Sequence, residues 1–69
     1  MASEEMRYLM ENKEDLEREH SGRYVAIRRE QIVAIGRTIH EVYAILKELH
    51  IKNPLVAYIP KEGEEALLI

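Results

Sequence analysis

Apolar residues along the chain follow two spacings, and each spacing predicts a different kind of element. Two short runs rich in β-branched residues, 23–29 and 31–36, precede a stretch of helical spacing after Thr38, and a third run covers 55–60. Short apolar runs are typical of strands, whereas apolar residues three or four apart are typical of an amphipathic helix. With a helical pattern over 4–19, the order predicts an α+β fold: an N-terminal helix, a β-hairpin, a helix and a strand (αββαβ), with a single small three-stranded sheet.

The first predicted helix has a good start and a narrow apolar side. Ser3 is a suitable N-cap, because its hydroxyl can accept a hydrogen bond from an early helical N–H, and Gly22 suits the chain reversal that ends the helix. The apolar stripe is interrupted by Lys13 and consists of Met6, Leu9, Met10 and Leu16. Such a helix either covers the sheet as a lid or pairs with a helix of another subunit.

The turn between the first two strands has an unusual sequence, Arg29-Glu30. A two-residue hairpin loop usually needs a positive φ, which neither Arg nor Glu adopts without cost. We therefore expect a longer loop with a type I turn, or a bulge, and a mobile tip. Alternation places Val25 and Ile27 on one face of the first strand. Residues 32–35 are apolar throughout, so the second strand is expected to be covered on both faces.

A capping box marks the start of the second helix. In this motif the Thr38 hydroxyl can accept from the Glu41 N–H, while the Glu41 carboxylate accepts from the Thr38 N–H. The predicted apolar face consists of Ile39, Val42, Tyr43, Leu46 and Leu49. Ile45 widens this face beyond what a three-stranded sheet needs, and Asn53-Pro54 ends the helix. Because strand–helix–strand connections are right-handed, the second and third strands are expected to run parallel, either adjacent or with the first strand between them.

The chain is expected to form one domain with three parts: an N-terminal amphipathic helix (1–21), a ββαβ core (22–60), and a polar turn with an apolar tail (61–69). A chain of 69 residues buries only about 60% of its unfolded surface, and this one has no cysteine for a disulfide or a thiolate metal site. We therefore expect association with other chains to supplement the core. The tail is expected to add a short strand or to dock on a neighbour, and its apolar residues include Leu67, Leu68 and Ile69.

Composition bears on where the protein acts. No apolar stretch approaches the roughly 20 residues that span a bilayer, and residues 1–5 lack a cationic segment followed by an apolar one. This predicts a soluble cytoplasmic protein with no membrane partner. Charged residues make up 33% of the chain, against a usual share of about 25%, and Asn, Gln and Cys are scarce. This bias is reported for heat-adapted proteins, so we expect a thermophilic source.

Charge is unevenly distributed along the chain. Residues 1–20 are acidic on balance, whereas 21–52 are basic. The basic segment carries Tyr24 among four arginines: Arg23, Arg28, Arg29 and Arg37. These arginines either balance the acidic helix on a solvated face or contact an anion or an acidic partner. Nucleic acid is an alternative partner, although the net charge of −3 and the pI of about 5.6 contrast with the pI above about 9 of dedicated binders.

Several short motifs together resemble a known family. The run 22–27 (Gly-Arg-Tyr-Val-Ala-Ile), a second run ending in Gly36, a helix and a strand over 54–60 are similar to a small prokaryotic, mainly archaeal, domain family of unknown function. Its members share a Gly-[Lys/Arg]-[Trp/Tyr]-Val-Ala-Ile hairpin, a helix and a Val-rich final strand. Arg29-Glu30 stand where that family has Asp-Gly. The resemblance implies the ββαβ arrangement and supplies neither catalytic residues nor a function.

The sequence contains no recognisable catalytic or metal-binding pattern. Its histidines, His20, His40 and His50, include no pair at the i, i+4 spacing that brings two imidazoles to one metal, and its isolated glycines form no phosphate loop. We therefore expect no cofactor, no bound metal and no enzymatic activity.

The interpretation that remains is a non-catalytic protein-interaction or regulatory module, which acts as a homo-oligomer (a dimer or larger) or as an adaptor for another protein. The alternative is a protein that binds nucleic acid or another anion through the basic hairpin. The candidate contact residues are Arg23, Tyr24, Arg28, Arg29, Arg37, Ile45, Leu67, Leu68 and Ile69.

Overall fold

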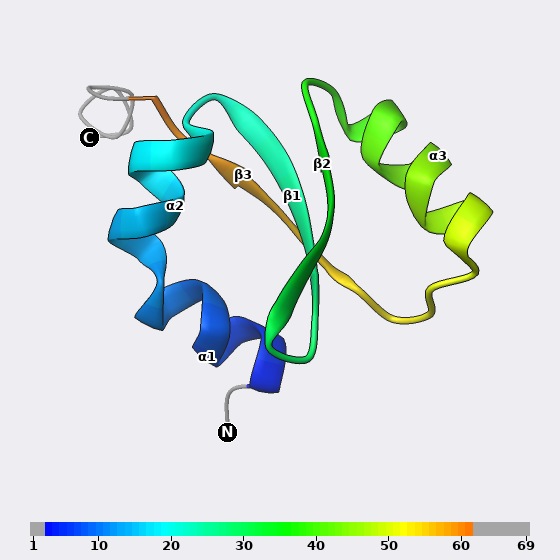
Figure 1. The fold of residues 1–69 in the computed structure, drawn as a ribbon, viewed down its shortest axis with the longest axis horizontal. Helices are drawn as coiled ribbons and strands as arrows, with labels where there is room; N and C mark the ends of the chain where they lie inside the picture. Colours follow the sequence, from blue (N-terminus) through cyan, green and yellow to red (C-terminus); the bar gives the residue numbers. More distant parts are fainter. Residues whose placement is uncertain (1–2, 62–69) are drawn as a thin grey trace.

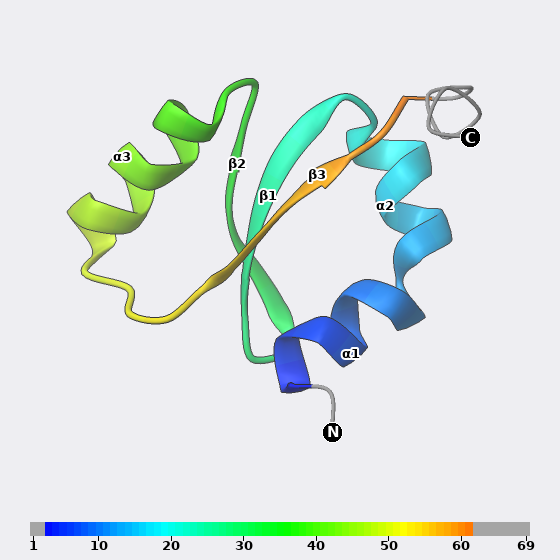
Figure 2. The same ribbon diagram turned by 180° about the vertical axis from the view of Figure 1, so that it is seen from behind.

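The elements occur in the predicted order. The computed structural model describes residues 3–61. The elements are α1 (Glu4–Glu11), α2 (Lys13–His20), β1 (Arg23–Arg28), β2 (Gln31–Gly36), α3 (Ile39–Leu49) and β3 (Leu55–Ile59). Figures 1 and 2 show the sheet in the middle, with α1 and α2 on one side and α3 on the other. The structure confirms an α+β fold of the order αββαβ, with its N-terminal helical part divided in two.

β1 is the central strand of the sheet. It pairs antiparallel with β2 on one side and with β3 on the other, in the order β2-β1-β3. β2 and β3 therefore run parallel with β1 between them, which is one of the two arrangements that a right-handed crossover allows. Both β2 and β3 are edge strands of the sheet that residues 3–61 form.

Side chains of β1 are buried alternately against the two helical layers. Val25 and Ile27 pack with Leu16 of α2 on one face. The buried residues of the other face, which α3 covers, are Ala26, Ala34, Val42 and Leu46. The predicted alternation of β1 is confirmed. Helices cover both faces of the sheet, as expected from the apolar residues of β2, although Ile35 of β2 stays exposed.

The N-terminal helix is broken at Asn12, so the prediction of one continuous helix over 4–19 is wrong. Asn12 has φ −109° and ψ 16°, outside the helical region. Its backbone N–H donates to the carbonyl of Tyr8 at 3.0 Å, and its side-chain amide donates to the same carbonyl at 2.9 Å. The backbone bond is the ordinary i to i−4 bond of a helix, and the asparagine side chain competes with it for the same carbonyl. The break falls beside Lys13, where the apolar stripe was interrupted.

Only part of that stripe reaches the core. Leu16 is buried and Leu9 packs beside it, whereas Met6 and Met10 are exposed. Tyr8, which was not counted in the stripe, packs on the same core. Because the two helices point in different directions (Figure 1), residues spaced along one straight helix no longer share a face. The helices cover the sheet as a lid, which is one of the two expected arrangements.

The hairpin turn is shorter than expected. Arg28 lies opposite Gln31, so only Arg29 and Glu30 form the loop, and Arg29 has a φ of 61°. The expectation of a longer loop is wrong, because a tertiary contact opposes the local cost: the Arg29 N–H donates to the Glu5 carboxylate of α1 at 2.6 Å. The mobility of the tip stays a prediction.

A β-bulge interrupts the pairing of β1 with β2. Ala26 lies opposite Ala34, but the next residue, Ile27, lies opposite Ile32, so Val33 is an extra residue in β2. A bulge was predicted for the hairpin, and one is present, within the strand and not at the tip. It places Val33 and Ala34 on the same face of the sheet, where both pack in the core under α3.

The capping box of α3 is present as predicted. Thr38 Oγ1 accepts from the Glu41 N–H at 3.2 Å, and Glu41 Oε2 accepts from the Thr38 N–H at 3.2 Å. The Arg37 N–H donates to the same carboxylate oxygen at 2.7 Å. Gly36 allows α3 to begin close to the end of β2, since a Cβ at this position would lie 2.9 Å from the Cβ of Glu41.

The apolar face of α3 is buried only along its centre. Val42 and Leu46 pack on the sheet, and Ile45 is half-buried beside them. Three residues of the predicted apolar face are exposed: Ile39, Tyr43 and Leu49. α3 packs mainly on β2 and β1, and the sheet is too narrow to cover more of the helix, which agrees with the expectation that this apolar face is wider than the sheet needs.

Candidate interaction surfaces

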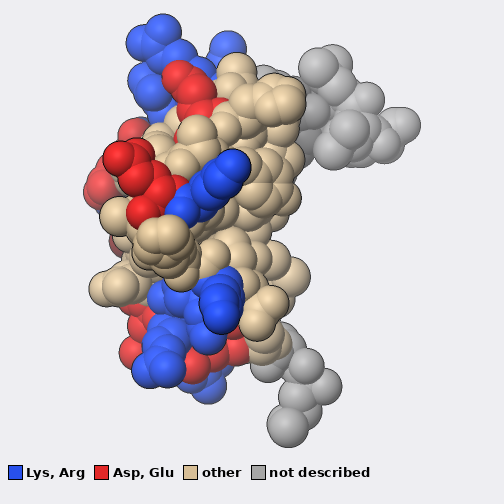
Figure 3. Space-filling view, turned by 90° about the vertical axis from the view of Figure 1, so that its right-hand side faces the viewer, with Lys and Arg blue, Asp and Glu red and all other residues tan. Residues whose placement is uncertain are grey.

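The four arginines of the hairpin region do not form one cluster. Arg23 begins β1 and Arg28 ends it, and a strand of this length separates them by about 17 Å. Arg37 lies at the Arg23 end, because Gly36 is opposite Tyr24. In Figure 3, Lys and Arg gather at separate places with acidic groups between them. The interpretation of the hairpin as one basic patch is wrong, because the strand register places the arginines at opposite ends.

Arg28 is engaged inside the molecule. Its guanidinium donates to Glu5 Oε2 at 2.8 Å, and this oxygen also accepts from the Arg29 N–H. The Arg29 N–H and, to a smaller extent, the Arg28 guanidinium lower the pKa of Glu5 below its ordinary value. Sequence reasoning missed Glu5, because the only hint of its contact was a tight turn without glycine.

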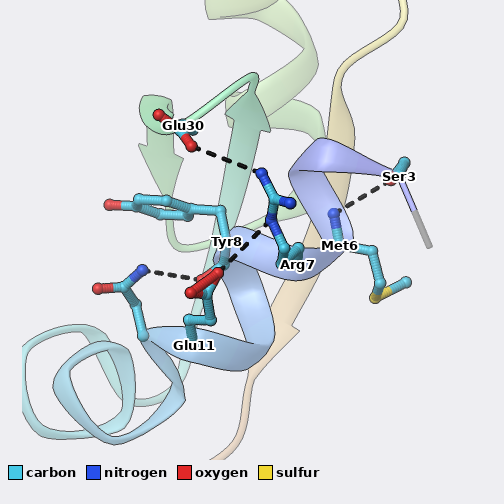
Figure 4. Close-up of polar contacts among 7 residues, drawn as sticks. Ser3, Met6, Arg7, Tyr8, Glu11 and Glu30 are labelled. Carbon is cyan, nitrogen blue, oxygen red and sulfur yellow. Dashed lines mark hydrogen bonds and ion pairs between the residues drawn. The ribbon is translucent and has the colours of Figure 1, made fainter.

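Arg7 gives α1 a further contact with the hairpin tip. In Figure 4 its guanidinium lies between two carboxylates, with Nε 3.6 Å from Glu11 Oε1 and Nη2 3.7 Å from Glu30 Oε1. Ser3 caps the same helix, since its Oγ accepts from the Met6 N–H at 3.1 Å. The predicted N-cap is confirmed. These ion pairs are exposed, so each adds little stability, and the buried Glu5 carries the main connection.

Tyr24 forms an aromatic pair across the sheet. It lies opposite Tyr58 of β3, with ring centroids 5.0 Å apart at an interplanar angle of 49°. Tyr24 packs against the core under α3, whereas 42% of Tyr58 is exposed. The aromatic residue that was expected among the arginines is therefore part of the sheet surface beside α3.

A groove lies at the C-terminal half of α3, and we call it the α3 groove. Its volume is about 350 Å³. Its lining residues are Tyr43, Leu46, Lys47, His50, Ile51, Lys52 and Pro54. The apolar members form its floor, and the exposed Lys47, His50 and Lys52 form its rim. Sequence reasoning missed this site, because it placed Tyr43 only on the apolar face of the helix and did not single it out as a contact residue.

A second apolar surface lies along the outer side of β2, and we call it the β2 edge surface. It consists of Ile32, Val33, Ala34 and Ile35 of β2 together with Ile45 of α3. Ile45, a predicted contact residue, thus lies partly in the core and partly on this surface. Ile35 was not predicted, although its place in a run without polar residues was a signal.

Leu67, Leu68 and Ile69 lie outside the described residues, as does most of the predicted 61–69 segment. Within residues 3–61, no group of three or more His, Cys, Asp or Glu side chains is arranged to hold a metal ion. None of the helices in this part of the chain has the length and apolar character needed to span a membrane.

Comparison with known proteins identifies the family. Residues 15–62 match a family of unknown function (DUF5678), over more than two thirds of the chain. The chain belongs to this family. The DUF5678 match runs from within α2 to just beyond β3, so it includes the whole sheet, the α3 groove and the β2 edge surface. Glu5 lies outside it. No curated protein and no solved structure matches the chain.

Proposed function

We infer that this DUF5678 protein is a non-catalytic interaction module, which binds a segment of another protein as an adaptor and associates with itself. The α3 groove is the observation that carries the adaptor role. Its apolar floor stays open to solvent, and Tyr43 at its side is 52% exposed. Tyrosine beside an apolar pocket is a common anchor of protein interfaces.

The rim of the α3 groove indicates the chemistry of the partner. Lys47 and Lys52 carry positive charge, and the imidazole of His50 lies beside them on the rim. A partner segment with an apolar side chain for the floor and carboxylates for the rim fits this arrangement. Complementary charge of this kind raises the association rate, and its effect decreases as salt increases.

Site-specific crosslinking tests the proposal. A photoreactive phenylalanine at position 43 is expected to crosslink one partner protein in a lysate of the source organism. The same group at position 10 is the control, because Met10 is 67% exposed but lies on α1, away from α3. Equal crosslinking at both positions, or none at position 43, would overturn the adaptor role.

Charge reversal gives a second test with the partner in hand. Lys47→Glu combined with Lys52→Glu is expected to slow association, most strongly at low salt. Arg7→Glu combined with Arg18→Glu changes the charge equally on α1 and α2 and is expected to leave binding unchanged. Nucleic-acid binding would replace this proposal if titrations with DNA and RNA showed affinity that falls steeply with salt.

We also propose that the protein comes from an archaeal, heat-adapted source and is cytoplasmic. Heat adaptation is supported by the charged share of 33% and the absence of cysteine. A cytoplasmic location agrees with the absence of a membrane-spanning helix among the described residues. A melting temperature above the roughly 45–65 °C of mesophilic domains would support the heat adaptation.

A further inference from the structure

The two edges of the sheet are protected to different degrees. β3 lies between Pro54 and Pro60, and proline at the ends of an edge strand discourages pairing with another chain. β2 has neither proline nor a charged residue from Gln31 to Gly36. Within residues 3–61, no strand pairs with the outer side of β2. An edge with unpaired backbone groups and apolar side chains favours the addition of another strand.

The β2 edge surface is apolar on both faces of the sheet. Ile32 packs in the core under α1 and α2, and Ile35 lies on this face because it is opposite Val25. Val33 and Ala34 lie on the face that α3 covers. Ile35 is 37% exposed and Ile45 borders the surface from α3. A strand added here would bury apolar groups on both faces.

The bulge determines which self-pairing is consistent. In an antiparallel pair of two identical strands related by a two-fold axis perpendicular to the sheet, residues that lie opposite each other belong to the same face. Ile32 and Ile35 share one face, and Val33 and Ala34 share the other. When Ile32 lies opposite Ile35 of the second copy and Val33 lies opposite its Ala34, every pair along the strand has both residues on the same face. When the pairing is shifted by one or two residues, some residues lie opposite a residue of the other face.

Charge complementarity supports the same register. This register brings the hairpin turn of one copy, which contains Glu30, near the residue that follows β2 in the other copy, Arg37, and the symmetry repeats this pair. Both residues are exposed. Opposite charges that lie close together across an interface are favourable, and two such pairs would flank the isoleucines.

We propose that β2 is a self-association site, at which a second copy of this chain pairs antiparallel with Ile32 opposite Ile35, so that Glu30 in the turn of one copy lies near Arg37 of the other. The two sheets then form one continuous sheet of both copies. This inference rests on the proposed function in that it names the self-associating surface. The β2 edge surface is separate from the α3 groove, so an experiment can overturn self-association at β2 and leave the adaptor role standing, or the reverse.

Cysteine crosslinking tests the register, since the chain has no cysteine of its own. Ile32→Cys protein mixed with Ile35→Cys protein is expected to form a disulfide-linked dimer, because opposite Cα atoms about 4.5–5.5 Å apart suit a disulfide. Each variant alone is expected to crosslink far less. Crosslinking of either variant with itself at the same yield as the mixture would overturn the register.

Sedimentation measurements test the surface. Wild-type protein is expected to be dimeric at micromolar concentration, and Ile35→Lys to weaken the dimer at least tenfold. Met10→Lys places the same charge on an exposed apolar residue of α1 and is expected to have no effect. A dimer equally resistant to both changes would refute the β2 surface. A monomer at all concentrations, combined with specific crosslinking at position 43, would refute self-association and leave the adaptor role standing.

A charge exchange completes the test without changing the core. Glu30→Arg and Arg37→Glu are each expected to weaken the dimer, because like charges then lie close together. The double variant is expected to recover most of the loss, since opposite charges are restored with their places exchanged. Additive weakening in the double variant would overturn the pairing.

Discussion

Glu5 shows how one side chain decides the geometry of a distant turn. It accepts hydrogen bonds from the Arg29 N–H and the Arg28 guanidinium, although 23 positions separate it from Arg28. A left-handed conformation costs a residue such as Arg roughly 1–2 kcal/mol. The structure therefore places a carboxylate where it stabilises the N–H of the one turn residue whose φ is 61°.

Replacement of Arg29 by glycine should stabilise the protein. The contact with Glu5 uses the backbone N–H of Arg29, which glycine keeps. Glycine removes the left-handed strain and adds freedom to the unfolded chain, so the net gain is about 0.5–1 kcal/mol. Chemical denaturation of Arg29→Gly measures it. A lower midpoint would mean that the Arg29 side chain itself stabilises the fold.

Acid should weaken the connection between α1 and the hairpin. The folded pKa of Glu5 lies below its ordinary value of 4.5, so folding favours the charged form. The resulting stabilisation is complete at pH values above the unfolded pKa and is lost as pH falls through the folded pKa. The stabilities of wild type and Glu5→Gln should therefore differ at pH 6 to 7, and the difference should shrink progressively as pH falls below the ordinary pKa of 4.5. A constant difference across this range would contradict the role of the charge.

At the scale of elements, local hydrogen bonds determine where α3 begins. The capping box joins Thr38 and Glu41 in both directions, and the Arg37 N–H shares the same carboxylate. α1, by contrast, ends at Asn12, whose side-chain amide donates to the carbonyl that its own backbone N–H already uses. Thr38 thus helps to begin a helix and the Asn12 side chain helps to end one, and each contact joins residues no more than four positions apart.

Loss of the cap should destabilise α3. Thr38→Ala removes the acceptor of the Glu41 N–H and is expected to cost about 1 kcal/mol in free energy of unfolding. Thr38→Ser keeps the hydroxyl and serves as the control, with a change of a few tenths of a kcal/mol at most. Equal midpoints for wild type and Thr38→Ala would show that the cap contributes nothing measurable.

At the scale of the whole molecule, two small cores lie on opposite faces of a three-stranded sheet. Among residues 3–61, each core has four buried apolar residues, and several large apolar side chains stay exposed around them. A chain of 69 residues divided in this way has little buried area on either face. Association with a second copy would add to the buried area at β2.

Thermal stability should therefore depend on protein concentration. A dimer that dissociates on unfolding melts at a higher temperature as its concentration rises. Wild-type protein is expected to show this increase over a hundredfold range of concentration, and Ile35→Lys is expected to melt at a lower temperature with a weaker dependence. A cooperative wild-type melt with a constant midpoint would contradict self-association.

The sequence by itself determined the features that depend on neighbours along the chain. The α+β order, the alternation of β1, the Ser3 cap and the capping box at Thr38 all follow from interactions within a few residues, and the structure confirms them. The break at Asn12 is also local. It was missed because a side chain that competes with helical hydrogen bonds has a weaker pattern than apolar spacing.

Only the tertiary structure decided what depends on residues distant in sequence. The central place of β1, the separation of Arg23 from Arg28 in space, and the burial of Val42 in preference to Tyr43 all require the strand register and the position of α3 on the sheet. The tight turn at Arg29 requires Glu5 from another helix. Local propensities contribute fractions of a kcal/mol per residue, so burial and a charged hydrogen bond from a distant element outweigh them.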